Sequence, residues 1–190
     1  MRKKIIIAGV DEVGRGCLAG PVVSAAVILN KGINLKLLKD SKKISFKKRQ
    51  EISYHIKSHS IYAIGLASVD EILDLNILQA SLLSMKRAVE KLPVKPDLTL
   101  IDGNFTPSGL KNCKPIINGD EKVKEISAAS IIAKVYRDNL MIKLAQEFSD
   151  YAWERNFGYG TKAHLEGLKK FGITSHHRKG FKPVHKILTN

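Results

Sequence analysis

Four acidic residues each follow a short apolar run of the kind that forms a buried strand: Asp11, Glu12, Asp102 and Asp120. In α/β proteins, ligand sites tend to form where core strands end at the edge of a sheet. Carboxylates gathered at one edge repel one another unless a cation neutralises them, and oxygen ligands suit Mg²⁺ or Mn²⁺. We therefore expect the four to form a catalytic metal site. The alternative, that each caps a turn, is common for a single Asp but weaker for all four together.

The net positive charge of the chain is concentrated in two segments. The sequence has 32 Lys and Arg against 18 Asp and Glu, a formal charge of +14. Residues 31–60 contribute +7 and residues 151–190 contribute +6, whereas residues 61–150 are nearly neutral. This distribution predicts a polyanion-binding surface, and an acidic site in basic surroundings is typical of metal-assisted phosphodiester cleavage. The alternative is that the lysine-rich faces contribute only to solubility.

Residues 14–19, Gly-Arg-Gly-Cys-Leu-Ala, match the dinucleotide-binding pattern G-x-G-x-x-A after a strand. We reject that function because Gly20-Pro21 interrupts the chain where the pattern requires a helix, and Val22–Leu29 has the composition of a strand. Closely spaced glycines instead allow backbone amides to approach a sugar or a phosphate. We therefore expect this loop to contact nucleic acid.

Hydrophobic periodicity predicts an α/β protein with a mixed sheet. The expected strands cover residues 3–10, 22–29, 61–66, 98–101 and 114–117. The expected helices begin after a Ser45 cap, after an Asp70 cap with apolar positions from Ile72 to Leu92, and near residues 123 and 161. A chain of 190 residues is expected to form one structural unit, with a core over 1–150 and a basic, nucleic-acid-binding extension over 151–190.

The sequence gives no sign of a membrane protein or of a disulfide-stabilised one. Its apolar runs are far shorter than the ~20 residues of a membrane-spanning helix. It contains two cysteines, Cys17 and Cys113, and neither belongs to a C-x-x-C pair. We therefore expect no membrane association and a reducing, cytoplasmic compartment.

Several motifs, in order along the chain, resemble those of ribonuclease HII: Asp11-Glu12-Val13-Gly14-Arg15-Gly16, Asp40-Ser41-Lys42-Lys43, Ser127-Ala128-Ala129-Ser130-Ile131-Ile132-Ala133-Lys134 with Arg137-Asp138, and Gly158-Tyr159-Gly160-Thr161. The resemblance implies a ribonuclease H-like fold, a mixed five-stranded sheet flanked by helices, with a small C-terminal helical extension. It implies Mg²⁺- or Mn²⁺-dependent cleavage of RNA in RNA/DNA hybrids and at single ribonucleotides embedded in duplex DNA. Two-metal-ion hydrolysis would leave 3′-hydroxyl and 5′-phosphate ends. The four-carboxylate centre of the family corresponds to Asp11, Glu12, Asp102 and Asp120.

The resemblance also assigns substrate contacts. The residues that it places on the nucleic acid are Gly14, Arg15, Gly16, Ser41, Lys42, Lys43, Ser127, Ser130, Lys134 and Tyr159. Tyr159 is placed at the junction between ribonucleotide and deoxyribonucleotide, where its ring would pack on sugar and its hydroxyl would join the 2′-hydroxyl network. The implied partners are RNA/DNA hybrids and DNA that contains ribonucleotides, bound by a monomer.

Two other functions fit part of the sequence. Ribonuclease HIII shares the core motifs, but it usually carries a substrate-binding domain before the catalytic core, and here ten residues precede Asp11. A non-catalytic hybrid-binding protein would not need the full set of carboxylates. Asp138 either supports the metal site or pairs with a neighbouring cation. His176-His177 is expected in a basic loop that faces phosphate, and Trp153 is expected to anchor packing.

Overall fold

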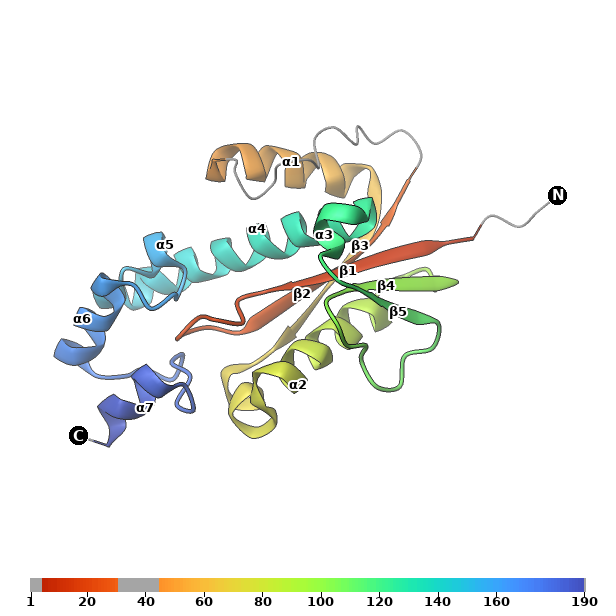
Figure 1. Ribbon diagram of the computed structural model, residues 1–190. Coiled ribbons are helices and arrows are strands. Elements are labelled where there is room, and N and C mark those ends of the chain that lie inside the picture. The colour runs from red at the N-terminus through yellow and green to blue at the C-terminus, as the bar shows by residue number, and fades with distance from the viewer. Residues whose placement is uncertain (1–4, 31–44, 190) are drawn as a thin grey trace.

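The computed structural model describes residues 5–30 and 45–189 (Figure 1). Its centre is a five-stranded sheet made of β1 (Ile7–Val13), β2 (Val22–Leu29), β3 (Ser60–Ala67), β4 (Leu98–Asp102) and β5 (Cys113–Ile116). The strand order is β3-β2-β1-β4-β5. The pairs β1–β2 and β2–β3 are antiparallel, whereas β1–β4 and β4–β5 are parallel. The expected mixed sheet of five strands is confirmed.

Helices cover both faces of the sheet and continue beyond one end of it (Figure 1). The helical elements are α1 (Phe46–Ser58), α2 (Val69–Glu90), α3 (Gly119–Lys122), α4 (Lys124–Glu147), the 3₁₀ turn η2 (Ser149–Tyr151), α5 (Trp153–Asn156), α6 (Lys162–Phe171) and α7 (Lys182–Leu188). One face of the sheet packs against α1 and α4, and the other packs against α2. Within the described ranges, no helix is long and apolar enough to cross a membrane.

Small side chains allow α4 to lie directly on the strands at the centre of the sheet. Ala25 of β2 shares a buried cluster with Ala128 and Ala129 of α4. The helix lies so close to β1 that a Cβ at Gly9 would come within 2.1 Å of the Glu125 carbonyl carbon. Only glycine permits this approach, which brings the first turns of α4 beside the strand that carries Asp11.

The N-cap of α2 is Ser68 and not the expected Asp70. The Ser68 hydroxyl accepts the Glu71 N–H at 3.1 Å, and the Glu71 carboxylate accepts the Ser68 N–H at 2.9 Å. This reciprocal capping box satisfies two backbone donors at once. Asp70 follows in the first turn, where its negative charge is favourable next to the helix N-terminus.

Helix α2 is kinked at Asn76, whose φ is 70°. The Asn76 Oδ1 accepts the N–H groups of Leu78 and Gln79 at 3.0 and 3.1 Å, and so caps the second part of the helix. The kink breaks the helical register between the two parts. As a result Leu75, which the regular spacing assigns to the core, is exposed.

The C-terminal elements pack against the far end of α4 and form a cluster of their own. Trp153 is fully buried in this cluster, with its ring stacked on Tyr151 at 5.1 Å, so its expected role in packing is confirmed. Leu18 and Ala19, from the loop after β1, belong to the same cluster. The glycine-containing loop is therefore held by the C-terminal elements as well as by the sheet.

Candidate active site

Three of the predicted acidic residues meet where β1 and β4 lie side by side. Asp11 and Glu12 lie inside β1 and not after it, because β1 remains paired with β2 as far as Val13. Asp102 is the last residue of β4, the parallel neighbour of β1. One carboxylate oxygen from each of the three lies within 4.8 Å of the others. The sheet therefore gathers Asp11, Glu12 and Asp102 into one acidic cluster.

Burial and mutual repulsion disfavour the ionised form of the carboxylates in the acidic cluster. Asp11 is buried, and this burial, together with the charges of Glu12 and Asp102, raises the pKa of its carboxyl well above the usual range. Burial also raises the pKa of Glu12, although the guanidinium of Arg15 opposes the shift. A divalent cation would supply the positive charge that the cluster lacks.

One oxygen of Glu12 is available for a cation. Glu12 Oε1 accepts a hydrogen bond from Arg15 Nη1 at 3.2 Å, whereas Oε2 is buried and has no hydrogen-bond partner among the described residues. Leaving a buried carboxylate oxygen unpaired is costly. Hard divalent cations bind oxygens of this kind, so the donor set of the acidic cluster fits Mg²⁺ or Mn²⁺.

Asp120 meets the acidic cluster through its backbone. The Asp102 Oδ1 accepts the Gly119 N–H at 2.6 Å and the Asp120 N–H at 3.3 Å, at the start of α3. These donors fix the orientation of the Asp102 carboxylate. Among the described residues, the carboxylates within 4.8 Å of one another are those of the acidic cluster, without Asp120. The role of Asp120 as a fourth metal ligand stays a prediction.

The first turns of α4 carry two of the predicted serines, and one of them, Ser130, contacts the acidic cluster. Ser130 hydrogen bonds to the Asp11 carboxylate, which also accepts the Glu12 N–H at 2.7 Å. Ser127 lies one turn earlier and is buried. Ser130 therefore holds Asp11 in place, and the predicted contact of both serines with nucleic acid stays a prediction. Three further predicted contacts lie outside the described residues: Ser41, Lys42 and Lys43.

Lys134 lies between a carboxylate and two aromatic rings. Its Nζ is 2.8 Å from Asp138 Oδ1. The same Nζ lies 4.9 Å from the ring centroid of Phe157 and 5.8 Å from that of Tyr159. Asp138 is fully buried, so of its two possible roles the structure shows the pairing with a neighbouring cation. This ion pair places Lys134 beside the tyrosine that is predicted to bind the junction.

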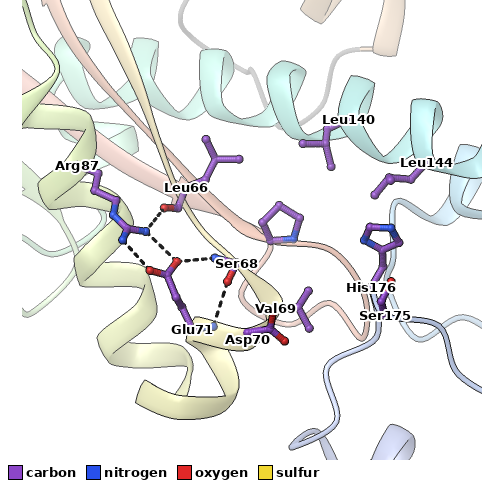
Figure 2. A pocket seen from close by; sticks show the side chains of 11 residues that line it. Leu66, Ser68, Val69, Asp70, Glu71, Arg87, Leu140, Leu144, Ser175 and His176 are labelled. Carbon is purple, nitrogen blue, oxygen red and sulfur yellow. Dashed lines mark hydrogen bonds and ion pairs between the residues drawn. The ribbon is translucent and has the colours of Figure 1, made fainter.

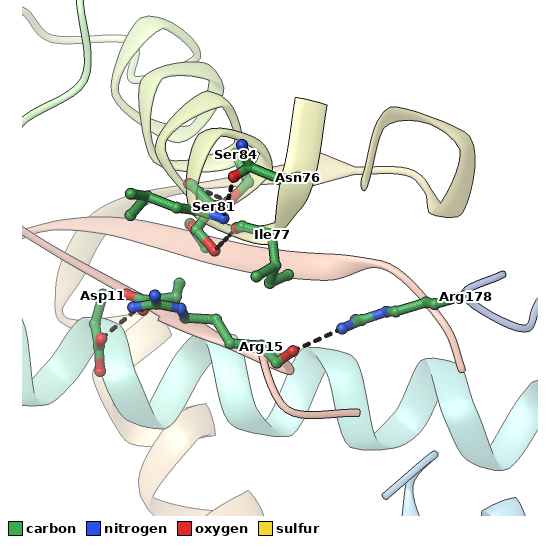
Figure 3. A network of polar contacts seen from close by, with 10 residues as sticks. Asp11, Arg15, Asn76, Ile77, Ser81, Ser84 and Arg178 are labelled. Atoms are coloured by element: carbon green, nitrogen blue, oxygen red, sulfur yellow. Dashed lines mark hydrogen bonds and ion pairs between the residues drawn. The ribbon is translucent and has the colours of Figure 1, made fainter. Parts of the chain in front are cut away.

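Two buried arginines, which the sequence does not distinguish from surface cations, hold the loop from Gly14 to Pro21. The guanidinium groups of Arg137 and Arg178 donate at 2.7–2.9 Å to five backbone carbonyls: those of Arg15, Ala19, Gly20, Pro21 and Phe157. Figure 3 shows the contact between Arg178 and Arg15. Burial lowers the pKa of Arg178 to about 10, so the side chain remains charged at neutral pH.

The two predicted glycines of this loop differ in what they are required for. Gly14 has a φ of 92°, and a Cβ there would lie 2.1 Å from Arg137 Nε, so both conformation and packing require glycine. At Gly16, a Cβ would meet no atom within 4 Å. The backbone at Gly16 is therefore open to a ligand, and the side chain of Arg15 beside it is half-exposed.

A separate pocket of about 630 Å³ lies between the start of α2 and the second half of α4 (Figure 2). Arg87 donates to both carboxylate oxygens of Glu71, at 2.8 and 2.6 Å, and to the Leu66 carbonyl at 2.8 Å. The charged groups that Figure 2 joins by dashed lines are thus paired with one another. None of the described residues that are predicted as metal ligands or that the resemblance places on nucleic acid lines this pocket, whereas His176 of the predicted phosphate-facing loop does.

The expectation that His176-His177 forms a loop facing phosphate is wrong for His177. The His177 side chain is fully buried, and its Nε2 lies 3.0 Å from the Nε2 of His164. Its ring packs against Tyr151, with 4.7 Å between the centroids. The aromatic and apolar side chains of the C-terminal cluster cover this histidine, and the sequence spacing alone gives no signal of that.

The chain is similar to known proteins along almost its whole length. A family model described as Ribonuclease HII matches residues 8–185. The Ribonuclease HII of Pelagibacter ubique is 59% identical over 185 residues, which cover 96% of this chain and 99% of that protein. The crystal structure of ribonuclease H2 from Pyrococcus horikoshii OT3 matches with a TM-score of 0.80 and 27% identity, over 96% and 97% of the two chains. Bst-RNase HIII in complex with Mn²⁺ shares the fold, with a TM-score of 0.73 and 18% identity over 97% and 70%.

Proposed function

The chain belongs to the ribonuclease HII family of metal-dependent endoribonucleases that act on RNA/DNA, and from this premise we propose that it cuts both RNA/DNA hybrids and single ribonucleotides embedded in duplex DNA. The acidic cluster carries the proposal. Its three carboxylates lie within 4.8 Å of one another, and a buried oxygen of Glu12 has no partner among the described residues. A protein that only bound hybrids would not need these buried, unpaired carboxylates, which are unfavourable unless they bind a cation.

The acidic cluster would hold Mg²⁺ or Mn²⁺, with Asp120 completing the site. When bound, two such ions would activate the attacking water and neutralise the leaving 3′-oxygen in an in-line displacement that leaves 3′-hydroxyl and 5′-phosphate ends. The protein itself orients the ligands: Ser130 holds Asp11, and two backbone N–H groups of α3 hold Asp102. Support of this kind behind metal ligands commonly affects activity by about 10- to 100-fold.

Discrimination of RNA from DNA would use the loop after β1 together with Tyr159. The 2′-hydroxyl is the one group that distinguishes an embedded ribonucleotide from its neighbours. The open backbone at Gly16 would approach this hydroxyl, and the half-exposed Arg15 would contact the adjacent phosphate. Tyr159 is 40% exposed, and burial of the rest raises the pKa of its hydroxyl. The hydroxyl therefore keeps its proton at neutral pH and is able to donate a hydrogen bond.

The basic segments 31–60 and 151–190 would bind the phosphate backbone of the duplex, so affinity should fall steeply with salt. The second segment contributes less charge to the surface than the sequence indicates, because Arg178 is buried. We further infer a monomer that acts in the cytoplasm. Both Cys17 and Cys113 are free thiols in the structure, which suits a reducing compartment.

The test is cleavage of a DNA duplex that contains one ribonucleotide, compared in Mg²⁺, in Mn²⁺ and in a chelator. We expect cutting with either ion, no cutting in the chelator, and no cutting of the all-DNA duplex. Asp11→Asn should still bind the duplex without cutting it. If the wild-type protein binds the duplex and leaves it intact under both ions, the proposal is replaced by that of a hybrid-binding protein.

A further inference from the structure

The turn that carries Tyr159 contains backbone conformations that need support. Phe157, with φ 49°, and Gly158, with φ 85°, are both in the left-handed region, which is unfavourable for a residue with a bulky side chain such as Phe157. The Tyr159 carbonyl accepts two hydrogen bonds, from the Thr161 N–H at 2.8 Å and from Nδ1 of His164 at 2.9 Å. The imidazole of His164 thus holds the backbone of the residue to which we assign junction recognition.

The hydrogen bonds around His164 fix the position of each ring proton. The Thr174 N–H lies 2.9 Å from Nδ1 of His177, so this nitrogen is an acceptor and the neutral ring carries its proton on Nε2. His177 Nε2 then donates to His164 Nε2 at 3.0 Å, and Trp153 Nε1 donates to the same atom at 3.1 Å. Since Nε2 of His164 accepts, its proton is on Nδ1 and is donated to the Tyr159 carbonyl.

Packing keeps both imidazoles in these neutral forms. His164 and His177 are fully buried. The ring of Trp153 lies 5.2 Å from that of His177 and 6.0 Å from that of His164. Burial lowers the pKa of both histidines, in agreement with the proton positions that the hydrogen bonds require. The result is a directed chain of N–H donors that starts at Trp153 and His177 and ends at the Tyr159 turn.

The same C-terminal segment also holds the other side of the proposed recognition site. Arg178, next to His177, donates to the Arg15 carbonyl at 2.9 Å. The Leu18 N–H, from the same loop as Arg15, donates to the Gly158 carbonyl at 2.8 Å. The glycine-containing loop and the Tyr159 turn are therefore fixed relative to each other, and His164 lies behind the turn.

We propose that His164 is a positioning residue for Tyr159. Its neutral imidazole, fixed by His177 and Trp153, sets the position of the Tyr159 ring against the ribonucleotide. The proposal rests on the proposed function, because it takes Tyr159 as the group that contacts the ribonucleotide. His164 is buried and acts through one N–H group. Its loss should therefore reduce the rate of cleavage and leave the affinity for the duplex unchanged.

Two amide substitutions separate the two nitrogens of His164. His164→Asn places an amide near Nδ1 and keeps a donor for the Tyr159 carbonyl. His164→Gln places an amide near Nε2, keeps a partner for Trp153 and His177, and loses the contact with Tyr159. For a duplex with one ribonucleotide, we expect kcat to fall about 10- to 100-fold in His164→Gln with Kd unchanged, and much less in His164→Asn. Equal kcat values for the two variants would overturn the proposal.

A double-mutant cycle with Tyr159→Ala separates positioning from a general effect on the fold. His164→Gln should lower kcat in the wild-type background and have no further effect in the Tyr159→Ala background, where no ring remains to be positioned. An equal loss in both backgrounds would show a merely structural role and overturn the proposal. If Tyr159→Ala itself cleaves normally, the junction assignment under the proposed function fails. If Tyr159→Ala is impaired and His164→Gln is not, only the inference about His164 fails.

Discussion

The acidic cluster and the Tyr159 turn differ in how their polar groups are satisfied. The acidic cluster comes from two adjacent strands and leaves charge uncompensated: burial raises the pKa of Asp11, and Glu12 Oε2 has no partner among the described residues. The Tyr159 turn is held by His164, five residues along the chain, and by the more distant Leu18 and Arg137. The ring nitrogens behind the turn all have hydrogen-bond partners. The first region is suited to receive a cation, and the second to keep its shape before the substrate arrives.

This difference follows from what each region would do. Partners on one oxygen of a carboxylate orient it as a metal ligand, whereas an oxygen that is to bind the ion has to be left without a protein partner, as Glu12 Oε2 is among the described residues. A group that recognises shape must be held rigidly by its surroundings. Removing a charge should therefore stabilise the metal-free acidic cluster while abolishing activity. Removing a polar group behind the Tyr159 turn should reduce both stability and activity.

The largest effect is expected for Asp11→Asn. Cleavage should fall by more than about 100-fold. Removing a residue that only supports a metal ligand costs up to about 100-fold, and removing the ligand itself should cost more. The metal-free protein should melt at a higher temperature, because the amide avoids burial of charge beside Glu12 and Asp102. The exposed Asp74→Asn is the control and should change neither property. A lower melting temperature for Asp11→Asn would contradict the description of the acidic cluster as repulsive.

The contributions of the two regions to the free energy of unfolding should change with pH in opposite directions. Burial, with the nearby His164 and His176, lowers the pKa of His177 to about 4. The unfolded chain takes up this proton near pH 6.5 and the folded protein does not, so stability is lost as the pH falls from about 6.5 to 4, by up to about 3 kcal/mol. The raised pKa of Asp11 acts in the other direction, because the metal-free folded state binds that proton more readily than the unfolded chain.

Urea unfolding of metal-free wild type and His177→Gln at several pH values isolates the histidine contribution. Wild type should lose more unfolding free energy than His177→Gln between pH 6.5 and 4, because the amide does not titrate in this range. Identical pH profiles for the two proteins would show that His177 takes up its proton over the same pH range in the folded protein and in the unfolded chain. The buried, neutral hydrogen-bond chain would then be the wrong description of this region.

The sequence predicts the acidic cluster better than the Tyr159 turn, because the evidence for the cluster is local. An apolar run directly before a carboxylate indicates a strand that presents it, and the order of the strands brings Asp11 next to Asp102. The exact strand end is less predictable: β1 continues through Glu12 because β2 pairs with it. The kink at Asn76 likewise depends on a side-chain cap that periodicity does not reveal.

The supports of the Tyr159 turn have no comparable local pattern. Arg178 and His177 belong to the basic segment that the sequence assigns to a nucleic-acid-binding surface, yet both are buried, as is Arg137. The partners of the two arginines are distant in the chain: Arg178 binds the carbonyl of Arg15, 163 residues away, and Arg137 binds that of Pro21, 116 residues away. Whether such a side chain lies on the surface or inside the protein is decided by tertiary packing, so composition assigned Arg178 and His177 to the wrong environment.

Alanine substitutions at Gly14 and Gly16, two positions of one loop, should have different effects on stability. Gly14→Ala should lower the free energy of unfolding by at least about 1–2 kcal/mol, since the residue has positive φ and a Cβ would clash with Arg137. Gly16→Ala should remain within about 0.5 kcal/mol of wild type, because its Cβ would enter open space. Under the proposed function, Gly16→Ala should nevertheless slow cleavage at an embedded ribonucleotide. Unimpaired cleavage by Gly16→Ala would mean that the substrate does not approach this face of the loop.

The smallest effect is expected for Tyr159→Phe, which keeps the ring and removes only the hydroxyl. One hydrogen bond contributes about 0.5–1.5 kcal/mol net, so cleavage at an embedded ribonucleotide should fall by about 2- to 12-fold. Tyr159→Ala should lose considerably more, because the half-exposed ring would no longer pack on the sugar, while duplex affinity stays near that of wild type. Cleavage and binding of the same duplex, measured in parallel, decide the matter. Equal, small losses in both variants would place junction recognition elsewhere. A loss in Tyr159→Phe as large as in Tyr159→Ala would assign recognition to the hydroxyl alone. The position of the ring would then matter only because it determines where the hydroxyl oxygen lies.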